Sequence, residues 1–435
     1  MIRLLVGASP PSLREPPRLP FQPARRVRRW RNGAQTRRSL ACAVAVLGAA
    51  LLAGCSSTAS TDTGTTPPPG ELTCSSTVSA SDAASAATAL AAAKPGSCVG
   101  LTGSVSGALD VPSGVALFGA SAATAITADG DAPGITLHEG SILTRVSIAS
   151  AKKVGVAIRA ANARVEKVTV SGAKTAAVAI LCKETETPGC AAGAIRLRDV
   201  ELTASALGLW VSGAHVLMNG GKSEGHTSTG LTGASGVVGV DGARLELDSV
   251  SVSKNQGAGV LVDGAKTTLL LKNGAVSENN ERGVWAQRLE GTLDNPAVKI
   301  DGTELVKNRI VGVGALESRG IIIVGGRIAN TVATPIATNL SATEDVGDGV
   351  GLFGGSGDLS VDSELDSNAR AAALIDGSER GIIIVGGRIT AGASGIKVVV
   401  QGKSGADVQV SSDLRSTPAA ALGVSAPKLT LPSVL

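Results

Sequence analysis

The chain repeats a short pattern in which a small residue is followed by an apolar, a variable and a second apolar position. Most repeats begin 21–24 residues apart, and the larger gaps hold inserted residues. Each pattern is long enough for one short strand, and its regular return predicts a stack of similar units. The repeats begin at Gly134, Gly155, Ala177, Gly208, Gly230, Gly259, Gly283, Gly312, Gly349, Ala372 and Gly395.

A second pattern follows most of these starts and alternates apolar with polar residues, as a half-buried strand does. Residues 165–168 (VEKV), 245–248 (LELD) and 298–301 (VKID) are examples. Gly, Asn, Asp and Ser separate the two patterns, which indicates turns. The segment RGIIIVGGRI occurs at Arg319–Ile328 and again 61 residues later, at Arg380–Ile389. The repeat unit therefore contains two or three short strands and no helix.

A repeat of this length with parallel strands leaves few architectures. A leucine-rich repeat needs a dense Leu and Asn consensus that the chain lacks, and a propeller blade needs about 40 residues. The body resembles the right-handed parallel β-helix family, the pectate-lyase-like superfamily, over about residues 74–415. Residues 83–120 resemble that family's amphipathic capping helix, a Pro-Gly turn and the first coil. The resemblance implies an all-β solenoid of about eleven coils over residues 73–416, with a short N-terminal capping helix and a C-terminal tail at 417–435.

The N-terminal region has the features of an export signal. Arg37 and Arg38 precede an apolar run from Leu40 to Ala53, which is too short to span a bilayer comfortably. The run ends in Leu-Ala-Gly-Cys at Cys55, which resembles the bacterial lipobox; the alternative is an ordinary signal peptide with a chance cysteine. The lipobox resemblance implies a signal peptide with an extended basic region at 1–54, lipidation of Cys55, and a Ser/Thr/Pro-rich tether at 55–72. Ser56 after the cysteine implies an outer-membrane lipoprotein of the bacterial envelope.

The charge divides between this leader and the body. Ten arginines against one glutamate give the first 55 residues a charge of +9, whereas the whole chain carries +4, so residues 56–435 carry −5. A body of that charge offers no electrostatic reason to bind nucleic acid. We therefore expect the membrane, through the lipid anchor, and a polysaccharide or envelope protein as partners. The oligomeric state is left open.

Four cysteines remain once the leader and Cys55 are set aside. An even number in an exported body favours disulfides. Of the three pairings that four cysteines allow, the local one joins Cys74 to Cys98 and Cys182 to Cys190. A metal site is not expected, because neither pair has a histidine at metal-binding spacing.

Polar residues recur four positions before successive repeat starts. Stacked in register, such side chains can bond their neighbours' amides, so we predict a structural ladder; a polar groove is the functional alternative. The predicted members are His226, Asn255, Asn279, Asn308, Asp345 and Asn368.

Repeated Asp-Gly pairs at Asp241, Asp263 and Asp376 raise the question of calcium, which takes carboxylate oxygens. Asp-Gly is also the ordinary chemistry of a tight turn, so no cofactor is expected. The resemblance would allow a polysaccharide lyase or glycoside hydrolase. The chain lacks the Asp-Asp, Asn-Thr-Asp and Gly-His-Gly elements of such enzymes, so we expect no catalytic site.

The third position of four successive repeats holds Trp210, Thr232, Leu261 and Trp285. If this position faces outward, both tryptophans of the body lie on one sheet, where an exposed indole marks an interaction site. Burial under a loop is the alternative. The expected function is a non-catalytic, envelope-anchored module that binds glycan or another envelope component. A diverged lyase or hydrolase and a structural spacer are the alternatives.

Overall fold

A computed structural model of the chain describes residues 72–149, 151–182, 193–228, 234–337, 343–377, 382–386, 388–389, 396–401 and 409–410. The chain divides into two compact units, Met1–Pro68 and Pro69–Leu435, and all described residues belong to the second. The predicted signal, nearly all of the tether, Cys55, Cys190, Thr232 and the tail at 417–435 therefore lie outside the described residues. Within them, no helix combines the length and the apolar character needed to cross a membrane.

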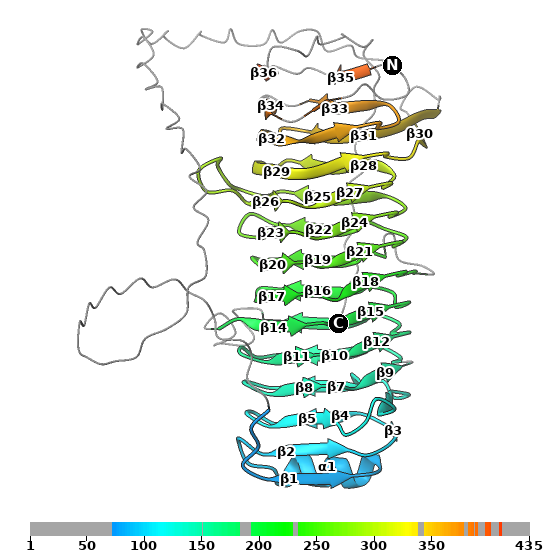
Figure 1. The fold of residues 1–435 in the computed structure, drawn as a ribbon, viewed down its shortest axis with the longest axis vertical. Coiled ribbons are helices and arrows are strands. Elements are labelled where there is room, and N and C mark those ends of the chain that lie inside the picture. The colour runs from blue at the N-terminus through cyan, green and yellow to red at the C-terminus, as the bar shows by residue number, and fades with distance from the viewer. Residues whose placement is uncertain are drawn as a thin grey trace, which may run out of the picture. The chain divides into compact units, whose positions relative to one another are not determined.

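The strands stack into three faces, and the central coils each contribute one strand to each face (Figure 1). Face 1 is a separate sheet of twelve parallel strands, to which the short antiparallel β30 (Thr334–Ala337) is added at β31. Its strands are β4 (Leu109–Val111), β7 (Ile135–Leu137), β10 (Val154–Ile158), β13 (Ala176–Leu181), β16 (Leu209–Ser212), β19 (Val237–Val240), β22 (Val260–Asp263), β25 (Arg282–Gln287), β28 (Ile310–Leu316), β31 (Thr343–Phe353), β33 (Ala371–Asp376) and β35 (Ile396–Gln401).

Faces 2 and 3 belong to one 23-stranded sheet that bends at a corner. Face 2 consists of β1 (Thr77–Ala80), β2 (Cys98–Leu101), β5 (Ala116–Gly119), β8 (Ile142–Thr144), β11 (Arg164–Glu166), β14 (Ile195–Arg198), β17 (His215–Asn219), β20 (Arg244–Asp248), β23 (Thr268–Lys272), β26 (Val298–Asp301), β29 (Arg319–Ala329), β32 (Gly357–Asp366), β34 (Ile382–Gly386) and β36 (Gln409–Val410). Face 3 consists of β3 (Val105–Ser106), β6 (Ala125–Thr127), β9 (Ser147–Ala149), β12 (Thr169–Ser171), β15 (Glu201–Thr203), β18 (Lys222–Glu224), β21 (Ser251–Ser253), β24 (Ala275–Ser277) and β27 (Glu304–Val306), and β29 and β32 continue into it.

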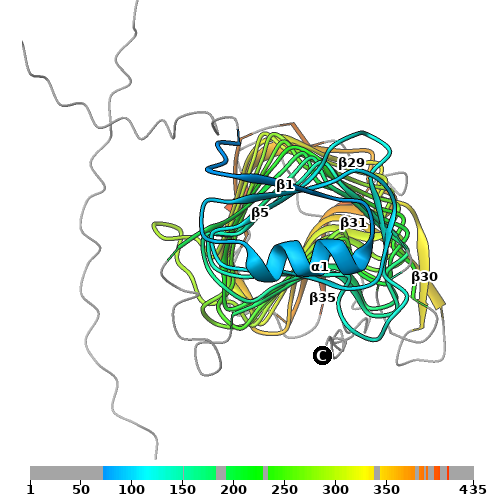
Figure 2. The ribbon, with the colours of Figure 1, turned by 90° about the horizontal axis from the view of Figure 1, so that it is seen from below.

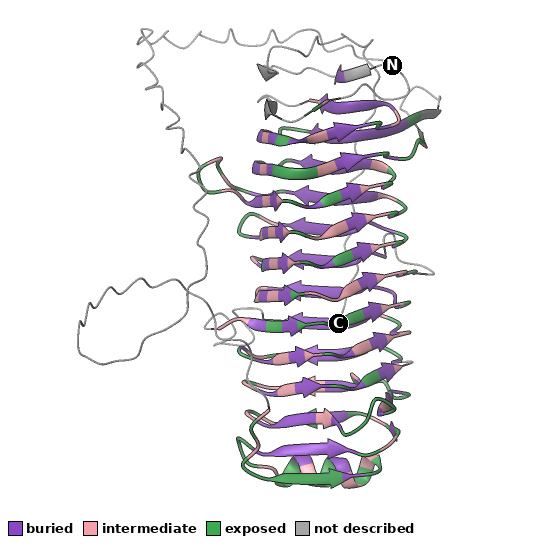
Figure 3. Ribbon diagram, viewed as in Figure 1, coloured by how far each residue is buried: buried purple, intermediate pink, exposed green. Residues whose placement is uncertain are grey.

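Alternation of apolar and polar residues closes each coil around a dry interior. In β20 the burial alternates, with Leu245 and Leu247 inside and their neighbours outside. The corner between faces 2 and 3 needs one residue with a positive φ, as at Lys167 (φ 53°) and Ser249 (φ 59°). Figure 3 shows the resulting band of buried residues along the stacked strands. The predicted all-β parallel solenoid is confirmed, with twelve face 1 strands where about eleven coils were expected.

A short helix closes the N-terminal end, as expected. Helix α1 (Ala83–Ala92) begins with a capping box, in which Asp82 accepts from the Ser85 amide and Ser85 accepts from the Asp82 amide. Ala86 and Leu90 are its buried residues, and Figure 2 shows the helix lying across the end of the coils. The Cys74–Cys98 disulfide fastens the segment before β1 to β2. Cys182 is disulfide-bonded as well.

One predicted coil begins at a different residue. The pattern placed a start at Gly230, whereas β19 follows Gly236 and pairs with β16 and β22. The glycine is required there because a Cβ at Gly236 would lie 2.7 Å from Asn255 Nδ2 of the next coil. Gly259 and Gly283 stand in the same relation to Asn279 and Asn308. The recurring glycine therefore makes room for the polar side chain stacked beside it.

Candidate functional site

The predicted tryptophan stripe does not present a row of exposed side chains. Trp210, Leu261 and Trp285 do occupy register-equivalent positions on the outer side of face 1, with Val238 between the first two. Trp210 is only 7% exposed, however, and Trp285 is fully buried. Of the two alternatives, exposed indoles and buried indoles, the structure shows burial for both.

Trp285 is held inside a second apolar cluster on this outer side. Its Nε1 donates to Gln287 (3.1 Å), and its ring lies 5.6 Å from that of Phe353. The Arg282 guanidinium lies 4.3 Å from the indole centroid, a cation–π contact. A Cβ at Gly314 would lie 2.4 Å from the indole, so the ring covers the glycine of the next coil. Trp285 therefore stabilises the coil stack and is not free to contact a ligand.

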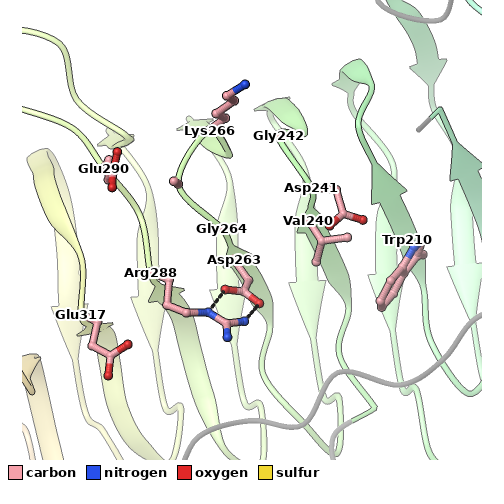
Figure 4. A pocket seen from close by; sticks show the side chains of 11 residues that line it. Trp210, Val240, Asp241, Gly242, Asp263, Gly264, Lys266, Arg288, Glu290 and Glu317 are labelled. Atoms are coloured by element: carbon pink, nitrogen blue, oxygen red, sulfur yellow. Dashed lines mark hydrogen bonds and ion pairs between the residues drawn. The ribbon is translucent and has the colours of Figure 1, made fainter. Parts of the chain in front are cut away.

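Trp210 differs from Trp285 because it lines a pocket. The pocket has a volume of about 860 Å³ and lies where the strands of face 1 end (Figure 4). Its walls come from five successive coils, those of β16, β19, β22, β25 and β28. Figure 4 shows Trp210 at one end and Glu317 at the other. The lining residues are Trp210, Val240, Asp241, Gly242, Asp263, Gly264, Ala265, Lys266, Arg288, Glu290 and Glu317. We call this feature the face 1 groove.

An ion pair lies at the centre of the face 1 groove. Arg288 Nε donates to Asp263 Oδ1 at 2.7 Å, and the second guanidinium nitrogen donates to the other carboxylate oxygen. The Asp263 side chain is 4% exposed, whereas that of Arg288 is 53% exposed. The hydrogen bonds to Asp263 raise the pKa of Arg288 above its ordinary value. Both carboxylate oxygens are therefore occupied by one cation, and the arginine still reaches solvent.

The remaining polar groups give the groove a mixed, slightly acidic character. The Ser212 hydroxyl donates to Asp241 Oδ2 at 2.7 Å, which fixes one carboxylate beside Trp210. Lys266, Glu290 and Glu317 are exposed. Four carboxylates against two basic groups leave a net charge of −2 along the lining. Such a surface offers hydrogen-bond donors and acceptors next to one apolar ring.

The repeated Asp-Gly pairs do not form one column of carboxylates. Val238 pairs with Leu261 and Gly239 with Val262, so Asp241 lies one register position beyond Asp263. Asp376 belongs to β33, two coils beyond the groove's last strand, β28. Among the described residues, no three His, Cys, Asp or Glu side chains gather closely enough to hold a metal ion.

The polar ladder forms between faces 3 and 1. Asn255 Nδ2 donates to Asn279 Oδ1 at 2.9 Å, and Asn279 Nδ2 donates to Asn308 Oδ1 at 2.8 Å. Asn368 Oδ1 accepts from the amide and hydroxyl of Thr331. These asparagines are completely buried, which gives them a structural role.

Asp345 is the one predicted member that the structure places elsewhere. It lies in β31, is exposed, and pairs with Pro335 of β30. The ladder position of that coil is taken by Thr331, two residues after β29. The inserted β30 hairpin lengthens the connection to Gly349, so counting back four residues from that glycine finds the hairpin and not the ladder.

His226 begins the amide part of the ladder. Its Nδ1 accepts from the Ser205 amide (3.2 Å), its Nε2 lies 2.9 Å from the Ser223 hydroxyl, and its own amide donates to Asn255 Oδ1. Burial lowers its pKa from 6.5 to about 4. The imidazole is therefore neutral at physiological pH and fully hydrogen-bonded.

Sequence reasoning missed most of the groove. Lys266, Arg288, Glu290 and Glu317 follow the ends of three neighbouring face 1 strands, but no motif joins them. A signal was available in the register: once β22, β25 and β28 are aligned, their following turns converge. Aligning these strands requires knowing which residues are inserted in each coil, and the sequence pattern does not show this.

Part of the described body matches a known family of repeats. Residues 134–332 match the model of a family described as right handed beta helix region. No curated protein sequence matches the chain significantly.

Solved structures with similar coordinates share little sequence. A variant of the periplasmic alginate epimerase AlgG is 10% identical, with a TM-score of 0.49, over 79% of this chain and 85% of that one. The A-module of the mannuronan C-5 epimerase AlgE4 from Azotobacter vinelandii is 16% identical, with a TM-score of 0.41, over 78% and 95%. The catalytic domain of a GH87 α-1,3-glucanase is 12% identical, with a TM-score of 0.42, over 82% and 70%. The family match and the stacked parallel strands of three faces together identify the described body as a right-handed parallel β-helix.

Proposed function

We propose that this protein is an exported, lipid-anchored β-helix whose face 1 groove binds a glycan strand of the cell envelope without cleaving it. The groove itself is the observation that carries the proposal: one pocket lined by five successive coils. Strands of neighbouring coils are about 4.8 Å apart, so the groove follows the coil axis for about 19 Å. That length suits several units of a linear polymer better than one small molecule.

The lining chemistry supports a sugar ligand. Hydroxyl groups of a glycan both donate and accept, and the groove supplies acceptors at Asp241 and Glu290 and donors at Lys266 and Arg288. Trp210 adds the small exposed part of its indole ring at one end, which offers an apolar contact for the C–H groups of a sugar. Few convergent polar groups beside an aromatic ring are typical of small-ligand and glycan sites.

The central carboxylate argues for binding over cleavage. A general acid or a nucleophile must exchange a proton or attack the substrate, and Asp263 uses both oxygens on Arg288. A diverged polysaccharide lyase or hydrolase is the second candidate, and it would have to use Asp241, Glu290 or Glu317.

The proposal is tested by glycan binding to the purified protein. A panel of neutral, amino and acidic polysaccharides is compared by affinity electrophoresis and calorimetry. Lys266→Ala should weaken binding about 10-fold or more by loss of a charged hydrogen bond, and Trp210→Ala should weaken it less, by loss of the apolar contact at the end of the groove. Lys307→Ala is the matched control, because Lys307 is 60% exposed and lies outside the groove.

The outcomes are separable. If no polysaccharide binds, or if Lys266→Ala binds like the parent protein, the groove proposal is wrong. New reducing or unsaturated chain ends would establish the enzyme alternative. Anchoring is measured separately by cell fractionation: Cys55→Ser should move the protein from the membrane fraction to the soluble fraction.

A further inference from the structure

Face 2 carries a cluster of basic side chains near the N-terminal end of the coil stack. Arg164 of β11 and Arg196 of β14 are register partners, so their Cα atoms face each other on adjacent coils. Arg145 follows β8, and Lys167 and Arg198 lie beside the pair. We call these five residues the face 2 basic patch.

The two register partners have no counter-charge. Neither Arg164 nor Arg196 makes an ion pair with any of the described residues, although Arg196 is exposed and Arg164 half-buried. Like charges opposite each other on neighbouring strands are destabilising. Some later basic residues of the same sheet have carboxylate partners: Lys222 with Glu201, Arg244 with Glu246, and Arg327 with Asp366. Within the patch, Arg198 lies 3.7 Å from Asp199, whereas Arg164 and Arg196 have no such partner among the described residues.

The local charge is positive despite the negative body. Five basic residues against Glu166 and Asp199 leave +3 on the outer side of β8, β11 and β14. Farther along face 2, the outward positions of β20, β23 and β26 carry three carboxylates (Glu246, Asp248 and Asp301) and three cations (Arg244, Lys272 and Lys299), so they are neutral overall. An anionic surface would therefore attract the first coils more strongly than these later ones.

An aromatic ring lies next to the patch. Phe118 of β5 is half-buried, and its ring lies 5.5 Å from the Arg145 guanidinium carbon. The ring also covers Gly100 of the preceding coil, where a Cβ would lie 2.8 Å from it. A part-exposed phenylalanine beside cations adds apolar area that a surface lying at the headgroup region can bury.

The position of the patch selects a membrane as its occupant. β14 is five strand spacings from the terminal strand β1, or about 24 Å along the stack. The described body begins at Leu72, beside β1, and the chain before it contains the apolar run and Cys55. The first coils are thus the part of the body that lies nearest to the proposed anchor along the chain.

From this arrangement we propose that the face 2 basic patch docks the first coils onto anionic phospholipid headgroups. This inference rests on the anchoring part of the proposed function. Arginine suits the task, because its planar donor fork binds phosphate oxygens in pairs. Docking of the first coils leaves the face 1 groove, on another face, open to a glycan.

The test compares variants of the purified protein on vesicles of phosphatidylcholine with and without phosphatidylglycerol. Each basic residue near an anionic surface adds about 1 kcal/mol, so Arg164→Gln with Arg196→Gln should lower the partition coefficient roughly 30-fold on the anionic vesicles. The control is Arg244→Gln with Arg327→Gln, which removes two arginines of the same sheet outside the patch. All proteins share one N-terminus, so leader and anchor contribute equally.

A second measurement is needed if the anchor alone binds all of the protein to the vesicles, because the partition coefficient then cannot differ between variants. Hydroxyl-radical oxidation of Phe118 should fall on anionic vesicles and stay high on neutral ones, and the patch variant should abolish the difference. Equal partition of the patch and control variants, together with unchanged Phe118 oxidation, would overturn the inference. So would competition by a soluble acidic polysaccharide with no response to phosphatidylglycerol. Failure of anchoring is seen separately in the Cys55→Ser fractionation.

Discussion

His226 should make the β-helix sensitive to mild acid. The imidazole is completely buried between Ser205, Ser223 and Asn255, none of which titrates in this range. Burial lowers its pKa from 6.5 to about 4. Between these values the unfolded chain binds a proton that the folded protein does not. The free energy of unfolding therefore falls as the pH is lowered from about 6.5 towards 4.

The size of the effect follows from the two pKa values. The full difference corresponds to about 3 kcal/mol, and about 2 kcal/mol of it is lost between pH 7 and pH 5. His226→Asn should remove this contribution, because an amide continues the asparagine column and does not titrate. All other groups are the same in both proteins, so their contributions cancel in the comparison.

The assay is urea unfolding at pH 7 and pH 5, followed by tryptophan fluorescence, for the parent protein and His226→Asn. The parent should lose about 2 kcal/mol more than the variant on acidification. An equal loss in both proteins would refute the reasoning. A measured His226 pKa near 6.5 by NMR would refute it as well.

Three further changes test the packing of the coils. Asn279→Ala should lower the free energy of unfolding by about 2–4 kcal/mol, because it removes the oxygen that accepts from the Asn255 amide and Nδ2, and one of the two donors to Asn308 Oδ1; Asn280→Ala, at an exposed position, is the control for denaturation with urea. Trp285→Ala should lower the free energy of unfolding in urea by about 3–5 kcal/mol, while the refolded protein still binds glycan. A full loss of binding would contradict the assignment of a structural role to Trp285 and a groove-lining role to Trp210. Gly259→Ala should lower the free energy of unfolding by about 1–3 kcal/mol, because its Cβ would lie 2.5 Å from Val276 Cγ1. An unchanged melting temperature would contradict this, since it would mean that the ladder accommodates a methyl group there.

Pattern arguments work well for this protein where the residues themselves set the structure. Alternation at residues 245–248 predicts β20, and the capping helix follows from an alanine-rich segment after Asp82. The asparagine ladder was also accessible, because Asn255, Asn279 and Asn308 precede glycines at constant spacing. The prediction of the ladder is wrong at Asp345, because the inserted β30 hairpin changes that spacing.

The register of the coils that carry insertions determines which side chains contact one another, and the sequence alone does not show that register. A strand position shows which side of a sheet a residue faces, so Trp210, Leu261 and Trp285 were correctly placed in one row. It does not show what covers that side. Burial of Trp285 depends on Gly314 and Phe353, which come from later coils, and on Arg282 of its own strand.

The sequence by itself determined the repeat, the parallel strands and the capping helix, because each depends on neighbours within about one coil. The tertiary structure alone decided which turns meet in the face 1 groove, which basic residues lack a partner on face 2, and which indole reaches a pocket. The physical reason is the stacking of coils. It brings side chains 20–40 residues apart to within one strand spacing, and insertions of unequal length hide that register from the sequence.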